Sequence, residues 1–468
     1  MIVRDWDELR SVMRGTWVQR PGDAIVPDRV TTDSRVDQID ALFFALAGER
    51  FDGHEYVADV ALRSPSGIVI HHNVDASDIP ANIAIIRVDD TRLALARLAR
   101  HHRRQLPTTR VIAITGTAGK TTTKTLLHTV LSQTMQGSCA PASFNNDIGV
   151  PLTILHARAG DQYLIVEVGT NAPGEIATLA DIAEPDISVV TLIGRGHLEG
   201  LGTIEDVAIE KMALIRALGD RGTAIMHADS PGWQPHIRPD MQLVRYGRDE
   251  DAELTLTDRQ WTRDDGWVEI NERERFPCRL PGEHNAMNTL ATIAIARRLG
   301  MTDDAIRAGL HTVTPAPMRA EIIEQNSLRI INDAYNANPE SMHAALAMLP
   351  EIRTPAQRCI VVLGDMLELG DQTSDCHGQL GREIAMQQQG GYVHAVMLIG
   401  PALRAALPYI DAPRDHTTFH ADALNDDARA TLRRWLRPGD LILLKGSRGI
   451  GLDALLDDLH PEPSALNV

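Results

Sequence analysis

The segment that most constrains the fold is an apolar run, Val111 to Ile114, which breaks into the loop Thr115-Gly116-Thr117-Ala118-Gly119-Lys120-Thr121-Thr122. The pattern predicts a strand, a tight loop and a helix. Two glycines allow the backbone to turn sharply with its N–H groups pointing inward, and the start of the helix adds the positive end of its dipole. Such a loop binds phosphates. The predicted ligand is therefore ATP with Mg²⁺, with the lysine on the outer phosphates and the Thr121 hydroxyl on the metal.

This loop is a shorter variant of the usual phosphate-binding pattern, because Ile114 stands where the first glycine is expected. A glycine-rich turn that merely joins a strand to a helix is the alternative. Gly-Lys-Thr-Thr directly after an apolar strand favours phosphate binding.

The length and composition indicate a soluble chain of several domains. With 468 residues, 43% of them apolar and 23% charged, the chain is too long for one core, and three domains are expected. The four cysteines lack the spacing of a disulfide framework or a zinc site, which fits a reducing cytoplasm. No signal sequence and no apolar stretch of ~20 residues is present, so membrane insertion is not expected.

The net charge of -17 argues against a nucleic-acid partner, because binding to a phosphate backbone needs basic patches. Only 4% of the residues are aromatic, so few side chains could stack on bases. The composition favours small-molecule substrates.

Two polar side chains follow further apolar strands of the same region. Glu167 ends the run 163–166, and His197 lies beyond the run 187–193. Since open α/β sheets bind ligands at the carboxyl ends of their strands, both are expected beside Lys120. A buried carboxylate needs a cation, which favours Glu167 as a Mg²⁺ ligand, although a strand-end glutamate can also simply face water. A single loop histidine is more often an exposed residue.

The predicted fold class is α/β with three domains. Residues 1–88 form a small α/β domain, and residues 89–314 form a central P-loop-type domain with a mostly parallel sheet. In residues 315–468, strands at 328–334, 359–364, 394–400 and 440–445 alternate with helical patterns, which predicts a doubly wound, Rossmann-like domain.

Several motifs together resemble the Mur ligase family. They are Gly-Thr-x-Gly-Lys-Thr-Thr at 116–122, Gly-x-His-Asn-x-x-Asn at 282–288, Tyr-Asn-Ala-Asn-Pro at 335–339, Leu-Gly-Asp-Met-Leu-Glu-Leu-Gly at 363–370 and Lys-Gly-Ser-Arg at 445–448. The similarity runs from about residue 30 to residue 455. It is strongest to the branch that joins D-alanyl-D-alanine to UDP-N-acetylmuramoyl-tripeptide.

The resemblance implies a monomeric, cytoplasmic, ATP-dependent ligase of peptidoglycan synthesis that works through an acyl phosphate. A Mur-type ligase that adds a single amino acid and a non-catalytic, ATP-gated binding protein are the alternatives. Leu192, Arg195-Gly196 and Asn332 depart from the family pattern and leave a different amine substrate open.

The resemblance also assigns roles to individual residues. It implies a catalytic and metal-binding set with two Mg²⁺ ions, in which Lys211 is carbamylated. The catalytic residues would be Lys120, Glu167, His197 and Lys211, and the metal ligands would be Thr121, Glu167, His197 and Lys211. Besides the residues 115–122, ATP would contact Asn288, Arg319 and Asp333. The UDP precursor would contact Ser34, Arg35, Gly48, Asp52, Gly53 and His54. Further substrate contacts would come from Asn145, Asn146, Tyr335, Asn336 and Asn338.

Overall fold

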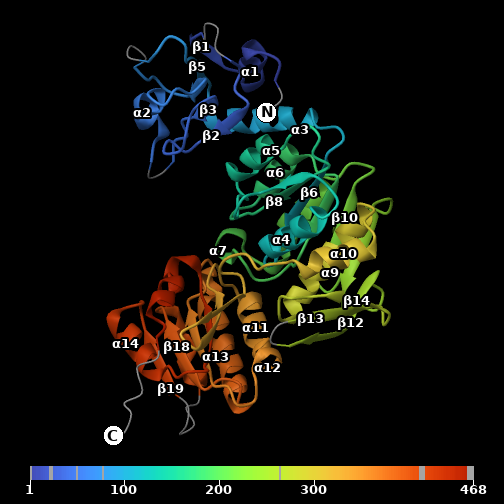
Figure 1. Ribbon diagram of the computed structural model, residues 1–468, viewed down its shortest axis with the longest axis vertical. Helices are drawn as coiled ribbons and strands as arrows, with labels where there is room; N and C mark the ends of the chain where they lie inside the picture. The colour runs from blue at the N-terminus through green and yellow to red at the C-terminus, as the bar shows by residue number, and fades with distance from the viewer. Residues whose placement is uncertain are drawn as a thin grey trace.

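The computed structural model describes residues 3–20, 25–48, 51–75, 79–262, 265–410 and 417–460. These residues build three sheets of five, nine and six strands. Figure 1 shows them arranged in chain order along the long axis, with the N-terminal part in blue and the C-terminal part in orange and red at opposite ends. The predicted three-domain α/β class is confirmed. The boundaries at 88 and 314 stay predictions.

The N-terminal sheet has the order β1-β5-β4-β3-β2, parallel except where β1 pairs with β5. Alternate residues of its strands pack on opposite sides: Phe43 and Ile68 lie in the core with α2, whereas Leu42 and Val69 lie in the core with α1 and α3. The elements are α1 (Trp6–Met13), β1 (Thr16–Gln19), β2 (Arg29–Thr31), β3 (Ala41–Phe44), η1 (Gly53–Tyr56), α2 (Val57–Ala61), β4 (Gly67–Ile70) and β5 (Ala84–Arg87).

The central sheet has the order β14-β13-β12-β11-β10-β9-β6-β8-β7. It is parallel from β7 to β12, and β12, β13 and β14 form an antiparallel extension. Its elements are α3 (Thr91–Arg104), β6 (Arg110–Thr115), α4 (Lys120–Leu131), β7 (Gly137–Cys139), α5 (Gly149–His156), β8 (Tyr163–Glu167), α6 (Glu175–Ala183), β9 (Ile187–Val190), α7 (Leu198–Leu201), α8 (Ile204–Arg216), β10 (Thr223–His227), β11 (Gln242–Gly247), β12 (Leu254–Trp261), β13 (Gly266–Ile270), β14 (Glu274–Pro277), α9 (Glu283–Arg298) and α10 (Asp303–His311).

Helices cover both faces of this central sheet. Ile112 and Ile114 of β6 share a core with α4, α9 and α10, while Val111 and Ala113 share the opposite core with α3, α5 and α6. The second core also contains the side of the N-terminal sheet that faces α3. Helix α3 therefore joins the first two domains through one continuous apolar layer.

The C-terminal sheet has the order β15-β16-β20-β17-β18-β19, with only β15 antiparallel to its neighbour. Its two faces are covered by α11–α13 and by α14, as the doubly wound prediction required. The elements are β15 (Glu321–Gln325), β16 (Leu328–Asp333), α11 (Pro339–Ala347), α12 (Leu349–Ile352), β17 (Cys359–Gly364), α13 (Thr373–Gln389), β18 (Ala395–Ile399), β19 (Thr417–Ala421), α14 (Asp426–Trp435) and β20 (Leu441–Lys445). The sequence prediction missed β15 and β19, the two edge strands.

Among the described residues, no helix is both long and apolar enough to cross a lipid bilayer.

Candidate functional site

The predicted strand, loop and helix are present at the centre of the chain. β6 ends at Thr115, Gly116 and Gly119 adopt φ values of +146° and +86°, and α4 begins at Lys120. A Cβ atom on Gly116 would lie 2.1 Å from Thr191 Oγ1, and one on Gly119 would lie 2.4 Å from Asn288 Oδ1. Both positions therefore require glycine for conformation and for space.

Lys120 lies folded over this loop. Its Nζ donates a hydrogen bond to the Gly116 carbonyl oxygen at 2.7 Å. Burial is the main reason that its pKa is lowered; the Arg319 guanidinium lowers the pKa further, while the carboxylate of Glu167 opposes the shift. The lysine is thus held over the loop at which the sequence predicts phosphates.

Glu167, at the end of β8, is 1% exposed and surrounded by donors. Its carboxylate accepts hydrogen bonds from the Thr121 hydroxyl at 3.0 and 3.1 Å and from the Asn145 amide at 3.1 Å. The Lys124 ammonium lies 3.5 Å from Oε2. These partners make the buried charge tolerable. They also bring a carboxylate and a hydroxyl oxygen together beside the phosphate loop, a donor set that suits a hard divalent cation.

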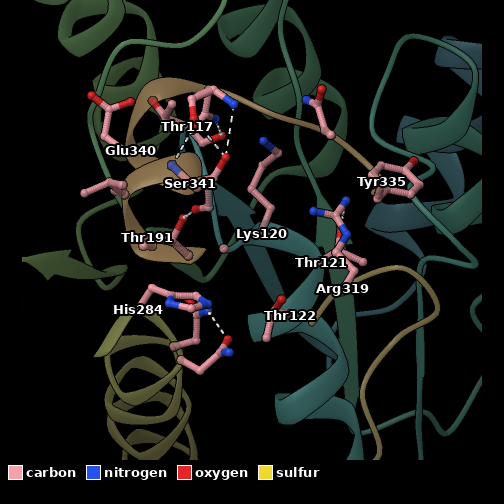
Figure 2. A pocket seen from close by; sticks show the side chains of 18 of the residues that line it. Thr117, Lys120, Thr121, Thr122, Thr191, His284, Arg319, Tyr335, Glu340 and Ser341 are labelled. Atoms are coloured by element: carbon pink, nitrogen blue, oxygen red, sulfur yellow. Dashed lines mark hydrogen bonds between the residues drawn. The ribbon is translucent and has the colours of Figure 1, made fainter. Parts of the chain in front are cut away.

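A cavity of about 280 Å³ lies between the central and C-terminal domains. The view into it in Figure 2 shows Lys120 pointing into the space between Arg319 and Ser341. Most of the predicted site residues line it. They are Thr117, Ala118, Gly119, Lys120, Thr121, Thr122, Asn145, Glu167, His197, Asn288, Arg319, Asp333, Tyr335, Asn336 and Asn338.

The C-terminal domain contacts the phosphate loop directly. Arg319 Nη2 donates to Thr121 Oγ1 at 3.1 Å, and its guanidinium lies 4.0 Å from the centre of the Tyr335 ring. The Asn338 amide donates to the Thr117 carbonyl oxygen at 3.4 Å. The two domains are therefore docked, with the loop at their junction.

His197 belongs to the cavity wall but turns toward the C-terminal domain. Its Nδ1 lies 2.6 Å from Glu368 Oε2, and this contact lowers the pKa of the Glu368 carboxyl. Arg195, one of the positions that departs from the family pattern, donates to Glu340 at 3.1 Å and to Gln379 at 2.7 Å. Both side chains tie the central domain to the C-terminal one.

The other two departures also have defined places. The Leu192 carbonyl oxygen accepts from the Thr117 N–H at 2.8 Å, and Leu192 lines the cavity. Asn332 is 1% exposed, and its amide donates to Glu321 Oε2 at 3.4 Å. Neither departure removes a polar group from the phosphate loop.

Lys211 lies behind the cavity, on α8. Its side chain is fully buried, and Nζ has no hydrogen-bond partner among the described residues. Burial, followed by repulsion from Lys120, lowers the pKa of Lys211 well below the ordinary lysine value. Both effects shift the protonation balance of Lys211 toward the neutral amine.

Some predicted residues lie elsewhere. Thr115 and Gly116, at the start of the loop, do not line the cavity, and their carbonyl oxygens accept from Thr191 and Lys120. The Asn146 side chain accepts from the Gly149 N–H at 2.9 Å, at the start of α5.

The residues predicted to hold the UDP precursor all lie in the N-terminal domain and do not line this cavity. Arg35 is paired with Asp33 at 2.8 Å, and the hydrogen bonds from Arg35 lower the pKa of Asp33 to about 2. His54 is buried against Asp52. Figure 1 shows the central domain between this part of the chain and the C-terminal domain.

Lysine usage reveals two residues that the sequence prediction missed. The chain contains 46 lysines and arginines, of which only four are lysines. Lys120 and Lys445 line the cavity, Lys124 contacts Glu167, and Lys211 lies beside Lys120. Arginine supplies the positive side chains elsewhere in the chain, so lysine is expected at positions where a compact ammonium or a neutral amine is needed. This signal could have identified Lys124 and Lys445 from the sequence.

Lys445 closes the C-terminal side of the cavity. It is 2% exposed, and its Nζ donates to Asp333 Oδ2 at 2.6 Å and to the Asn336 carbonyl oxygen at 3.2 Å. The pair fixes the loop that follows β16. Asp333 therefore faces the cavity from a rigid support.

We expect His284, in the cavity wall, to make folding sensitive to acid. Burial lowers its pKa to about 4, whereas a histidine in the unfolded chain titrates near 6.5. Below pH 6.5 the unfolded state takes up a proton that the folded state refuses, so stability falls as the pH drops toward 4. Between pH 7 and pH 4, the free energy of unfolding of His284→Gln, measured with urea, should fall by roughly 3 kcal/mol less than that of the wild type. His311→Gln, which changes an exposed histidine, is the control. An equal loss of unfolding free energy in all three proteins would show that His284 is not the source of the acid sensitivity.

Comparison with known families covers most of the chain. The Mur ligase family catalytic domain matches residues 28–103, the Mur ligase middle domain matches residues 114–296, and the glutamate ligase domain of Mur ligases matches residues 318–448.

Two curated relatives carry the same description. The UDP-N-acetylmuramoyl-tripeptide–D-alanyl-D-alanine ligase of Bacillus subtilis is 34% identical over 466 residues, which cover 99% of this chain and 100% of the relative. The ligase of that description from Escherichia coli is 35% identical over 395 residues, covering 81% and 83%.

Solved structures agree with the fold. MurF from Acinetobacter baumannii superposes with a TM-score of 0.84 at 29% identity, over 96% of this chain and 97% of that one. MurF ligase from Thermotoga maritima, solved in complex with ADP, has a TM-score of 0.80 at 25% identity, over 93% and 98%.

Proposed function

The chain belongs to the Mur ligase family, and we propose that it joins D-alanyl-D-alanine to UDP-N-acetylmuramoyl-tripeptide with hydrolysis of ATP to ADP and phosphate. One structural observation carries the proposal. The phosphate loop at Lys120 and the C-terminal residues Arg319 and Asp333 face a single cavity at the domain junction. A ligase needs this arrangement, because the nucleotide and the attacking amine must meet in one place.

The proposed reaction has two steps. The tripeptide carboxylate attacks the γ-phosphorus of ATP and displaces ADP. The dipeptide amine then attacks the acyl carbon of the resulting acyl phosphate, displaces phosphate and loses a proton. Lys120 neutralises charge on the moving phosphoryl group, and Arg319 holds the nucleotide from the other domain. Ligand binding should close the junction and exclude water, which would otherwise hydrolyse the acyl phosphate.

The residues present fit Mg²⁺. Glu167 and Thr121 would hold one ion, and His197 with a modified Lys211 would complete the proposed two-ion set. The fit rests on the oxygens of Glu167 and Thr121, which lie 3.0 Å apart in a buried site. When bound, the metal would supply positive charge to the phosphoryl oxygens.

Lys211 fits the proposed carbamate. Its buried amine has no hydrogen-bond partner among the described residues, and its lowered pKa makes the neutral amine, which is the form that reacts with CO₂, more accessible. The carbamate would turn an isolated cation-forming group into an anionic oxygen ligand.

The N-terminal residues Ser34, Arg35, Gly48 and 52–54 would hold the uridine nucleotide. We further propose a cytoplasmic monomer that acts on its small substrates without a nucleic-acid or membrane partner. All four cysteines are free, as a reducing compartment allows.

Phosphate release tests the proposal. The full chain, ATP and UDP-N-acetylmuramoyl-tripeptide should release phosphate only when an amine is added, and D-alanyl-D-alanine should be strongly preferred over D-alanine, L-lysine and meso-diaminopimelate. Product mass should show the added dipeptide. Incorporation of a single amino acid would move the chain to another Mur ligase class, and nucleotide binding without any turnover would indicate a binding protein.

Replacing Arg319 with lysine should weaken ATP binding. Lysine keeps the charge but loses both the Nη2 hydrogen bond to Thr121 and the stacking on Tyr335. We expect KM for ATP to rise about tenfold. The matched control is Arg195→Lys, which alters a domain contact away from Thr121. An unchanged KM for ATP in Arg319→Lys would remove this residue from the nucleotide site.

A further inference from the structure

Three histidines gather in the N-terminal domain, outside the cavity described above. His54 lies in η1, and His71 and His72 directly follow β4. One ring nitrogen of each lies within 4.8 Å of a ring nitrogen of both others. From this geometry we propose that His54, His71 and His72 form a site for one Zn²⁺ ion.

Each imidazole has one nitrogen occupied by an oxygen partner. Asp52 bridges two of the rings, with Oδ1 2.6 Å from His54 Nδ1 and Oδ2 3.3 Å from His72 Nε2. Thr91 Oγ1 lies 3.3 Å from His71 Nδ1. Zinc-binding histidines are oriented in this way, by an oxygen on the nitrogen that does not bind the metal.

The remaining nitrogens turn toward one another. His71 Nε2 lies 3.3 Å from His72 Nδ1. Two nitrogens bound to one tetrahedral zinc at ~2.05 Å are separated by about 3.3 Å, so this pair already has the required spacing. His54 Nε2 accepts a hydrogen bond from the His71 backbone N–H at 3.1 Å, and it must release this bond to bind the ion.

The cluster also provides one neutral ligand, His54, and an entry path. Burial, together with the two neighbouring histidines, lowers the pKa of His54 despite the opposing effect of Asp52, and neutral imidazole is the form that binds metal. The His72 side chain is 45% exposed, so an ion can enter from solvent. The His54 and His72 rings stack with their centres 3.6 Å apart, and the exposed His72 ring must turn for both lone pairs to converge. Three protein ligands leave a fourth position for water.

The alternative is a network of hydrogen bonds without metal. His71 Nε2–H could donate to His72 Nδ1, while Asp52 accepts from His72 and His54. Such a network would satisfy every ring nitrogen with neutral rings. The zinc site differs from this network in two ways, because His54 Nε2 must release the His71 N–H and the His72 ring must turn. A binding measurement separates the two.

The test is titration of the full chain, purified without a polyhistidine tag, with Zn²⁺ by calorimetry and with Co²⁺ by visible absorption. We expect the double variant His71→Gln/His72→Gln to lose one equivalent of metal and the absorption of a tetrahedral Co²⁺ site. His72→Gln alone, which changes an exposed ring and spares the fold, should raise Kd at least about tenfold. Asp52→Asn should raise Kd about 10- to 100-fold without removing a ligand. The exposed His156→Gln is the control.

Equal stoichiometry and Kd in the wild type and the double variant would overturn the zinc site in favour of the hydrogen-bond network. Comparing the two proteins also cancels any metal bound near Glu167. The measurement uses neither ATP nor precursor. Failure of the zinc site would therefore leave the proposed ligase function untouched. Because Asp52 and His54 also belong to the residues proposed to hold the uridine nucleotide, ligase activity is not used as a readout for the metal.

Discussion

Lys120→Ala should lose at least about 100-fold in kcat while its affinity for the UDP precursor stays within a factor of two or so of the wild type. The lysine lies over the phosphate loop, and the residues proposed to hold the precursor lie in another domain. Acyl phosphate formation should therefore fail without loss of precursor binding. Calorimetry with the precursor and with ATP, each measured alone, checks both parts of this expectation.

Lys120→Arg is the informative companion variant. It keeps the charge, but the larger guanidinium must fit where a compact ammonium now donates to Gly116. We expect it to remain strongly impaired. If folded Lys120→Ala no longer bound the precursor, the assignment of the two ligands to different domains would be wrong.

Lys211→Ala should lower kcat by about 100-fold or more, because it removes the proposed anionic metal ligand. Added acetate or formate should partly restore turnover by placing a carboxylate in the vacated space. Lys211→Arg should be equally inactive and should not respond, because the guanidinium stays protonated and cannot form a carbamate. Turnover as a function of acetate concentration measures the effect.

A spectroscopic readout separates the carbamate from a merely structural role for Lys211. The chain has only four lysines, so a carbamate carbon labelled with ¹³CO₂ should give one NMR signal that is absent from Lys211→Ala. Lys120→Ala, which keeps Lys211, should not be rescued by acetate. Full activity of Lys211→Ala without added acid would remove Lys211 from the catalytic set.

The docking of the C-terminal domain has a consequence for substrate entry. Arg319 donates to the Thr121 hydroxyl, the same oxygen that is proposed to contact Mg²⁺. A nucleotide or the proposed Mg²⁺ at this oxygen would therefore have to displace or lengthen the contact. Across the same junction, Arg195 pairs with Glu340 and His197 lies against Glu368.

Residues at the carboxyl ends of the central strands could be predicted because strand order obeys general rules. Glu167 and His197 were expected beside Lys120 on that ground, and all three line the cavity. Lys211 was expected there only from the family resemblance. Its helical surroundings alone suggest a solvated charge, whereas it is fully buried.

The sequence by itself determined the phosphate loop, the alternation of strands and helices, and the family. These features depend on local properties: glycine at positive φ, the period of apolar residues, and motifs of a few adjacent residues. Tertiary structure decided which side chains meet. Arg319 contacts a residue 198 positions away, and Lys124 is directed to Glu167 rather than to solvent. The first contact depends on how two domains pack and the second on how α4 packs against β8. Side-chain packing over long sequence separations leaves no periodic signal in a single chain.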